Sequence, residues 1–256
     1  MKISIVTAYY NRRQLLINTL KSISKTSHND FEVIVVDDGS TEENKIGDLP
    51  NEYPFLKVIR VEPEDKWYIN PCVPFNRGFK EASGEIVILQ NPECFHTSDI
   101  ISYVKTNLVE EDYLVFGCYS LSEEKTNQIT ENIENASGLV LNNHGANFDG
   151  DDAWYNHSIY RPKAFHFTSA IFKSKLDQLN GFDERYAMGY GYDDDEFLHR
   201  LKNICQVKMI DNPVVLHQHH YNLPKVKPDL SKIKLQDNRL LFSQTTIFEN
   251  KIKVNF

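Results

Sequence analysis

The sequence lacks any run of 18 consecutive apolar residues, and no cluster of lysine and arginine interrupts its acidic balance. Without such an apolar run we expect no membrane-spanning helix. The short apolar segment after Met1 is soon followed by polar residues, so we also expect no signal peptide. The formal net charge of -8 argues against nucleic acid as a general partner, because phosphate binding needs a basic surface. These absences favour a soluble, cytoplasmic protein.

Cysteine is also scarce. The four cysteines stand at positions 72, 94, 118 and 205, and no two of them form a Cys-x-x-Cys pair. This spacing argues against a disulfide-rich secreted scaffold and against a structural zinc site. We therefore expect reduced cysteines with packing roles. With 256 residues, 41% of them hydrophobic, the chain is long enough to build one large domain.

Short apolar runs alternate with segments of helical periodicity in the first half of the chain. Strands are predicted at 3–8, 32–36, 57–61, 85–89 and 113–118, and helices at 12–26, 75–82 and 99–108. Such alternation predicts an α/β fold with a mostly parallel sheet flanked by helices.

The second half is less regular. Between 121 and 160 the periodicity fails, which predicts long loops or a lid. A strand is predicted at 165–172, a short helix at 174–179 and a strand at 214–217. The segment after 222 mixes proline and lysine, with a possible helix at 235–242.

The segment GYGYDDDEFLHR at 189–200 places four consecutive acids where a glycine-containing loop enters a predicted helix. The spacing of the following apolar residues puts Asp194 at the buried edge of the helix start. The acids can simply cap the helix and complement its dipole. Because one or two acids suffice for capping, we favour a functional carboxylate here.

Asp37 and Asp38 follow the predicted strand EVIVV and precede a glycine and a serine. Open α/β sheets bind ligands at the carboxyl ends of their strands, and an aspartate there can accept a hydrogen bond from a ring N–H. Thr7 and Tyr9 at the end of the first strand would flank the same crevice. The alternative is a simple turn, since aspartate, glycine and serine all favour turns.

Two groups of candidate metal ligands follow predicted strands. Glu93 and His96 lie in the segment LQNPECFH, and His217, His219 and His220 end the strand VVL. Neutral imidazoles suit Mn²⁺ or Zn²⁺ once a carboxylate shares the site. The alternatives are an exposed, idle glutamate and histidines on a polar surface loop.

Aromatic residues stand out in the irregular segment. Trp154, Tyr155 and His157 lie beside two aspartates, and an exposed aromatic ring in such a loop suits stacking on the face of a sugar. Trp154 can equally plug the loop onto the core.

Together these motifs resemble the GT-A-fold glycosyltransferases, particularly the inverting family 2, over roughly residues 1 to 217. ISIVTAYYNR, VIVVDDGSTEE and FNRGFKEASGEIVIL occur in the family's order and at its spacing. NGFDERYAMGYGYDDDEF is similar to the GFDE and GWGGED-type segments of galactosyl- and N-acetylgalactosaminyltransferases. The resemblance implies a GT-A (Rossmann-like) single domain, with nucleotide-sugar binding in residues 1–96, acceptor binding and catalysis in 97–220, and a tail at 221–256.

The resemblance also implies roles at matching positions. Thr7, Tyr9, Asp38 and Asn76 would bind the nucleotide. Asp194 would be the catalytic base. Glu93 and His217 would bind a divalent cation, Mn²⁺ or Mg²⁺. We assign Trp154 and Asp193 to acceptor or sugar binding.

The chain departs from the family at the metal motif. Where the family usually has Asp-x-Asp, this sequence reads Gln90, Asn91, Pro92, Glu93, so only Glu93 keeps a charge. Phe75 also replaces an arginine that commonly precedes the matched asparagine. Either Glu93, His217 and the diphosphate hold the cation together, or the enzyme works without one; we favour the first.

The sequence thus predicts an inverting glycosyltransferase that moves a sugar from a nucleotide donor, expected to be UDP-linked, to a hydroxyl of a glycan or similar acceptor. One alternative is a catalytically silent nucleotide- or carbohydrate-binding protein of the same fold. Another is a nucleotidyltransferase, but such enzymes usually carry a glycine-rich loop after the first strand, where this chain reads AYYNRR.

Overall fold

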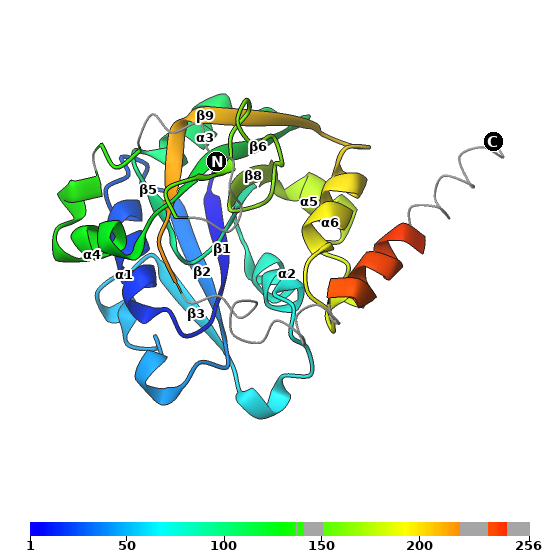
Figure 1. The fold of residues 1–256 in the computed structure, drawn as a ribbon, viewed down its shortest axis with the longest axis horizontal. Helices are drawn as coiled ribbons and strands as arrows, with labels where there is room; N and C mark the ends of the chain where they lie inside the picture. Colours follow the sequence, from blue (N-terminus) through cyan, green and yellow to red (C-terminus); the bar gives the residue numbers. More distant parts are fainter. Residues whose placement is uncertain (137, 141–150, 221–234, 245–256) are drawn as a thin grey trace.

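A computed structural model describes residues 1–136, 138–140, 151–220 and 235–244. One mixed sheet runs through the protein, with helices on both of its faces (Figure 1). Its strands are β1 (Ile3–Tyr9), β2 (Phe31–Asp38), β3 (Leu56–Val61), β4 (Ile86–Gln90), β5 (Cys94–His96), β6 (Asp112–Ser120), β7 (Trp154–Asn156), β8 (Thr168–Phe172) and β9 (Gln206–His217). The α-helices are α1 (Arg13–Ile23), α2 (Cys72–Glu81), α3 (Ile100–Asn107), α4 (Glu123–Glu131), α5 (Lys173–Leu179) and α6 (Asp193–Leu201), and a further helix covers residues 235–244.

The strand order is β3-β2-β1-β4-β8-β6-β9-β5, with β7 paired to β6. Strands β1 to β4 are parallel to one another, β8 is antiparallel to both of its neighbours, and β6 and β9 are again parallel. The predicted α/β class with a mixed, mostly parallel sheet in a single domain is confirmed.

Two apolar clusters cover the two faces of the sheet, because successive residues of a strand point to opposite sides. Ile3 and Ile5 of β1 pack with α1 and α3, whereas Val6 packs with α2, α5 and α6. This layering fixes the carboxyl ends of β1, β2 and β4 at one edge of the sheet, where polar side chains gather.

Two expectations for the second half need correction. The segment predicted to be irregular contains α4, whose first turn is capped by the Ser122 side chain, and also β7. The strand predicted at 214–217 is only the end of the much longer β9. Residues 137 and 141–150 of the predicted lid lie outside the described residues, as do 221–234 and 245–256 of the tail. The predicted helix at 235–242 is confirmed.

All four cysteines are free and buried, as expected from their spacing. Within the described ranges, the helices are too short or too polar to cross a membrane.

Helix α2 approaches β1 most closely at Gly78, and this contact can be tested. A Cβ atom there would lie 2.3 Å from Cγ1 of Val6 and 3.3 Å from Cγ2 of Val36. We expect Gly78→Ala to destabilise the protein by about 1–3 kcal/mol, because an overpacked core must shift. Thermal unfolding checks this, with Gly47→Ala as the control, since a Cβ at Gly47 has no neighbour within 4 Å among the described atoms. Equal melting temperatures for the two variants would contradict the packing described.

Candidate active site

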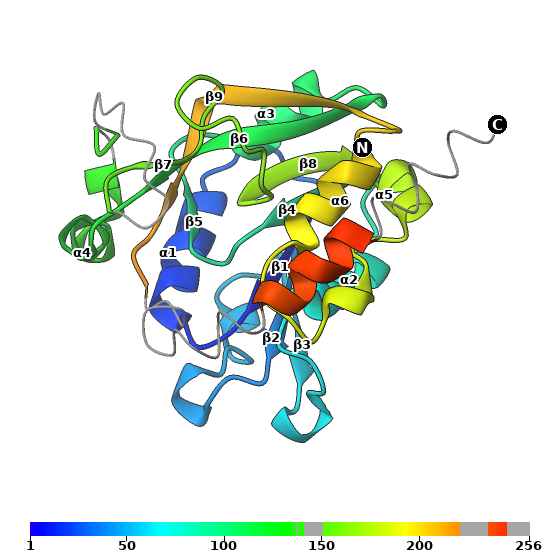
Figure 2. The same cartoon turned by 45° about the vertical axis from the view of Figure 1, so that its right-hand side comes forward.

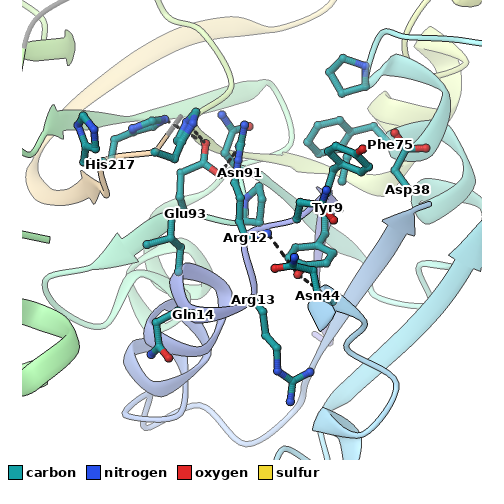
Figure 3. A pocket seen from close by; sticks show the side chains of 18 of the residues that line it. Tyr9, Arg12, Arg13, Gln14, Asp38, Asn44, Phe75, Asn91, Glu93 and His217 are labelled. Carbon is teal, nitrogen blue, oxygen red and sulfur yellow. Dashed lines mark hydrogen bonds and ion pairs between the residues drawn. The ribbon is translucent and has the colours of Figure 1, made fainter. Parts of the chain in front are cut away.

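A cavity of about 1020 Å³ opens at the carboxyl ends of β1, β2 and β4. The polar residues of its lining include Tyr9 to Gln14 at the end of β1, Asp38 at the end of β2, Asn91 to Glu93 after β4, and His217, His219 and His220 at the end of β9. Asn44, Lys66 and Tyr190 line it as well. Figure 3 shows Glu93 and His217 toward one end of the cavity and Tyr9, Asp38 and Phe75 toward the other.

The carboxylate of Asp38 marks one end of the cavity. Its Oδ1 accepts a hydrogen bond from the Tyr68 hydroxyl at 2.7 Å, and its Oδ2 lies 2.6 Å from Nζ of Lys66. Lys66 also stands 4.8 Å from the centre of the Tyr10 ring, which is 49% exposed. This end therefore combines an oriented carboxylate with an accessible aromatic face.

The neighbouring Asp37 has a structural role. Nη1 of Arg60 lies 2.8 Å from its Oδ2, and the backbone N–H of Ser40 donates to its Oδ1 at 3.1 Å. Of the two adjacent aspartates, only Asp38 lines the cavity.

Glu93 marks the other end, where its buried carboxylate lies among three partners. Nε2 of His217 is 3.0 Å and Nε2 of His220 is 3.4 Å from Oε1, and Nη1 of Arg12 donates to Oε2 at 2.8 Å. The pairing of β5 with β9 sets Cys94 opposite His217, which brings these distant segments together.

The donor atoms of Glu93, His217 and His220 fit a divalent cation. They lie within 4.8 Å of one another, and donors on opposite sides of an ion bound at about 2.1 Å lie roughly 4 Å apart. Burial by itself would raise the pKa of Glu93, but Arg12, His220 and His217 hold it well below its usual value. Burial lowers the pKa of His217 despite Glu93 nearby. An ionised carboxylate beside a neutral imidazole is the form that binds metal.

Gln218 positions this cluster and was not singled out from the sequence. Its fully buried amide Nε2 is within 3.2 Å of Thr19 Oγ1 and 3.0 Å of the Glu93 carbonyl oxygen, and its Oε1 accepts from Nδ2 of Asn18 at 2.8 Å. The end of β9 and the Glu93 loop are thereby both held against α1. A lone glutamine of this kind produces no periodic pattern in the sequence that could have predicted its role.

Asp194 lies beside the cavity and does not line it. Its carboxylate, 30% exposed, pairs with Nδ1 of the buried His166. The His166 ring packs edge-on against Phe75, a cavity residue, with ring centres 5.1 Å apart. Burial would lower the pKa of His166, but Asp194 outweighs it and raises the pKa above its usual value. Tyr190, on the loop before Asp194, does line the cavity.

Asp193 is buried next to Asp194. Its Oδ1 accepts from Nδ2 of Asn70 at 3.0 Å, and Oδ1 of Asn70 in turn accepts from the backbone N–H of Cys72 at 2.9 Å. The start of α6 is thus tied to the start of α2. Burial and the neighbouring Asp194 raise the pKa of Asp193 to about 6.

The two candidates on β1 are both buried. The Tyr9 hydroxyl donates to the carbonyl of Asn44 at 2.7 Å, so Tyr9 lines the cavity with its ring anchored. Its neighbour Tyr10 presents the more exposed ring. Thr7 is outside the cavity lining, and its Oγ1 has no hydrogen-bond partner among the described residues.

Two other candidates lie away from this cavity, which corrects their expected placement. Asn76 donates to the Phe182 carbonyl at 2.9 Å and accepts from the Phe182 N–H at 2.8 Å, so its amide holds the loop before α6. Trp154 is 5% exposed and packs against Tyr119 and His157. It therefore packs its loop onto the core, which is the alternative to sugar stacking given above.

The remaining aromatic and imidazole candidates also need reassignment. His96 is buried with its Nε2 2.7 Å from Oε1 of Gln90, away from Glu93's cluster. The accessible tryptophan is instead Trp67, 55% exposed beside Lys66. Contacts with residues distant in sequence determine which of the two tryptophans is buried. Local composition therefore could not predict that Trp154 is buried and Trp67 exposed.

Sequence comparisons identify the family. The profile of Glycosyl transferase family 2 matches residues 4–173, which is more than half of the chain. The chain belongs to this family. A second profile, described as the N-terminal domain of galactosyltransferase, matches residues 158–222 of this family 2 chain and so spans α6 and the histidines after β9.

Among curated relatives of this family 2 chain, the dolichol-phosphate mannosyltransferase of Pyrococcus furiosus is 32% identical over 104 residues, 40% of this chain and 28% of that protein. The uncharacterized glycosyltransferase YwdF of Bacillus subtilis is 31% identical over 127 residues, 50% of this chain and 46% of that protein. The chain spans less than half the length of each of these relatives.

Solved structures share the family 2 fold. TarS of S. aureus, in a complex with UDP-GlcNAc, superposes with a TM-score of 0.63 at 18% identity, covering 89% of this chain and 61% of that one. The mannosyltransferase PcManGT of Pyrobaculum calidifontis, in a complex with GDP-Man and Mn²⁺, gives a TM-score of 0.54 at 16% identity, covering 84% and 56%.

The raised pKa of Asp193 predicts a pH-dependent stability difference. Its folded pKa of about 6 exceeds the ordinary 3.8, so its contribution to stability is complete below 3.8 and is lost as the pH rises through 6. At pH 7.5 we expect Asp193→Asn to be more stable than wild type by about 1–3 kcal/mol, with the difference vanishing near pH 4. Thermal unfolding across this range measures it, with the exposed Asp177→Asn as control. A less stable Asp193→Asn at pH 7.5 would overturn the assignment.

Proposed function

We propose that this protein is an inverting glycosyltransferase that moves a sugar from a nucleoside diphosphate donor to a hydroxyl of a glycan or similar acceptor. One observation carries the proposal: in a family 2 chain, Glu93, His217 and His220 converge at one end of a cavity whose other end presents Asp38. The cavity is large enough for a nucleotide sugar, since ligand sites usually span about 300–1,000 Å³.

The polar ends of the cavity suit the two ends of the donor. Asp38 can accept a hydrogen bond from a ring N–H of the base, and the exposed Tyr10 ring can stack on it. Arg12 at the opposite end is 31% exposed and can bind the diphosphate as well as Glu93. We expect UDP as the nucleotide. TarS, which shares the fold, was solved with UDP-GlcNAc, so UDP-sugars are the first donors to test.

Asp194 is the proposed general base. The acceptor oxygen forms a bond to the anomeric carbon while the bond from that carbon to the diphosphate oxygen breaks, and the hydroxyl proton passes to the Asp194 carboxylate. A single displacement of this kind inverts the anomeric centre. The ion pair with His166 orients the Asp194 carboxylate before the acceptor binds.

Glu93, His217 and His220 would hold a divalent cation, with Mn²⁺ expected from the mixed carboxylate and imidazole donors. When bound there, such a cation would supply positive charge to the diphosphate leaving group. Arg12 would then be released from Glu93 to bind a phosphate oxygen, because the cation would take over neutralisation of the carboxylate.

The competing candidate is a silent nucleotide- or carbohydrate-binding protein, motivated by the missing Asp-x-Asp. It shares the cavity but predicts UDP binding without any donor turnover. Replacement of the proposed general base, Asp194, distinguishes a transferase from a binding protein.

Asp194→Asn should lower kcat for sugar transfer by about 10²- to 10⁴-fold, because a general base contributes roughly this factor. UDP affinity should remain unchanged, since Asp194 is outside the cavity lining. Transfer or donor hydrolysis with a panel of nucleotide sugars, together with calorimetric UDP binding, measures both. Asp195→Asn is the matched control from the same helix turn and should keep near wild-type activity. Undiminished transfer by a folded Asp194→Asn would refute this role.

Loss of a ligand should weaken cation binding. We expect Glu93→Gln and His220→Ala each to reduce Mn²⁺ affinity by about tenfold or more, measured by electron paramagnetic resonance of free Mn²⁺. His219→Ala is the control, because His219 lines the same cavity but pairs with Asp151 instead of Glu93. If all three variants bind Mn²⁺ like wild type, the cation does not occupy this cluster.

A further inference from the structure

The helix at 235–244 lies beside the loop that leads into α6 (Figures 1 and 2). Its most buried residue is polar: Asn238 is 3% exposed, whereas Leu235 and Leu240 are 43% and 60% exposed. The side of the helix that faces the loop thus carries an amide between two apolar residues, Leu235 beside Gly191 and Phe242 beside Tyr192. Because a buried amide is costly unless it is hydrogen-bonded, the partners of Asn238 explain why this residue is buried.

Asn238 satisfies two backbone carbonyls of the loop region. Its Nδ2 donates to the carbonyl of Tyr186 at 3.2 Å and to that of Gly191 at 2.8 Å. Phe242, one turn further along, packs on Tyr192 with ring centres 5.7 Å apart. The helix thus contacts the chain before α6 at Tyr186, Gly191 and Tyr192.

Gly189 shows how closely the two segments fit. A Cβ atom there would lie 2.0 Å from Oδ1 and 2.3 Å from Cγ of Asn238. The φ angle of Gly189 is outside the left-handed range, so its backbone would accept alanine. The side chain of Asn238 therefore occupies the space that a side chain at position 189 would need.

The loop held in this way carries candidate groups of the active site. Tyr190 lines the cavity, and the loop leads directly to Asp193 and Asp194 at the start of α6. From the other side, Nδ2 of Asn70 lies 3.4 Å from the Gly189 carbonyl and 3.0 Å from Oδ1 of Asp193. The loop is thus fixed between two amides, one from the chain before α2 and one from the helix at 235–244.

We propose that Asn238 is a positioning residue for transfer, which holds the loop at 189–192 so that Tyr190 and Asp194 meet the acceptor in one geometry. This inference rests on the proposed function. A loop with two glycines loses much conformational entropy when it is ordered, so it needs such contacts. A displacement of about 1 Å at a reacting group can lower the rate by about 100-fold.

The test is a double-mutant cycle in the full chain, with Gly189→Ala, Asn238→Ala and the double variant. Each single change should lower kcat by about 10- to 100-fold with UDP affinity and melting temperature little changed. The double variant should be more active than Gly189→Ala, because removal of the amide makes room for the new methyl group. Asn238→Asp, equal in size but without the N–H donor, should be as impaired as Asn238→Ala. Gly47→Ala is the neutral control.

Independent losses that multiply in the double variant would overturn the proposal, as would wild-type kcat in Asn238→Ala. Amide hydrogen exchange at 189–196 separates this outcome from failure of the proposed function. If the wild type transfers no sugar from any donor, the proposed function fails, and exchange alone decides the role of Asn238 in holding the loop. Faster exchange in Asn238→Ala at an unchanged melting temperature then supports that role, and unchanged exchange overturns it.

Discussion

The buried carboxylate of Glu93 constrains the site more than any other group. It is 1% exposed, and a buried charge is tolerated only when partners neutralise it. Those partners come from two places in the chain: Arg12 before α1, and His217 and His220 at the end of β9. The antiparallel pairing of β5 with β9 and the amide of Gln218 hold them together. The fold thus gathers one arginine and two histidines around one carboxylate at the edge of the sheet.

The chemistry proposed here needs a second, separate carboxylate, and the structure provides it in a different environment. Asp194 is partly exposed beside His166, while Asp193 next to it is buried and has a raised pKa. The two aspartates are therefore not equivalent. Asn70 fixes the buried one, whereas Asp194 is partly exposed at the start of α6.

Strand ends could be predicted from the sequence, and the contacts of single polar side chains could not. Asp38 and Glu93 each follow a strand of the parallel part of the sheet, so their position at one edge follows from the parallel topology, whereas the antiparallel pairing of β5 with β9 brings His217 to Glu93. Asn76 and Trp154 were placed by motif or composition, yet their partners Phe182 and Tyr119 decide where they point. The same applies to the amides of Gln218, Asn70 and Asn238, because a lone amide carries no periodic signal. Helix α4 was missed because only Thr126 and Ile129 of its residues are buried, which leaves too narrow an apolar stripe to detect.

The most direct test is a crystal structure with Mn²⁺ and UDP, in which anomalous scattering locates the manganese. We expect one manganese bound to Glu93, His217 and His220, with the diphosphate in contact with it and the uracil base at the Asp38 end of the cavity. Manganese bound elsewhere, or UDP bound while Arg12 still pairs with a metal-free Glu93, would contradict it.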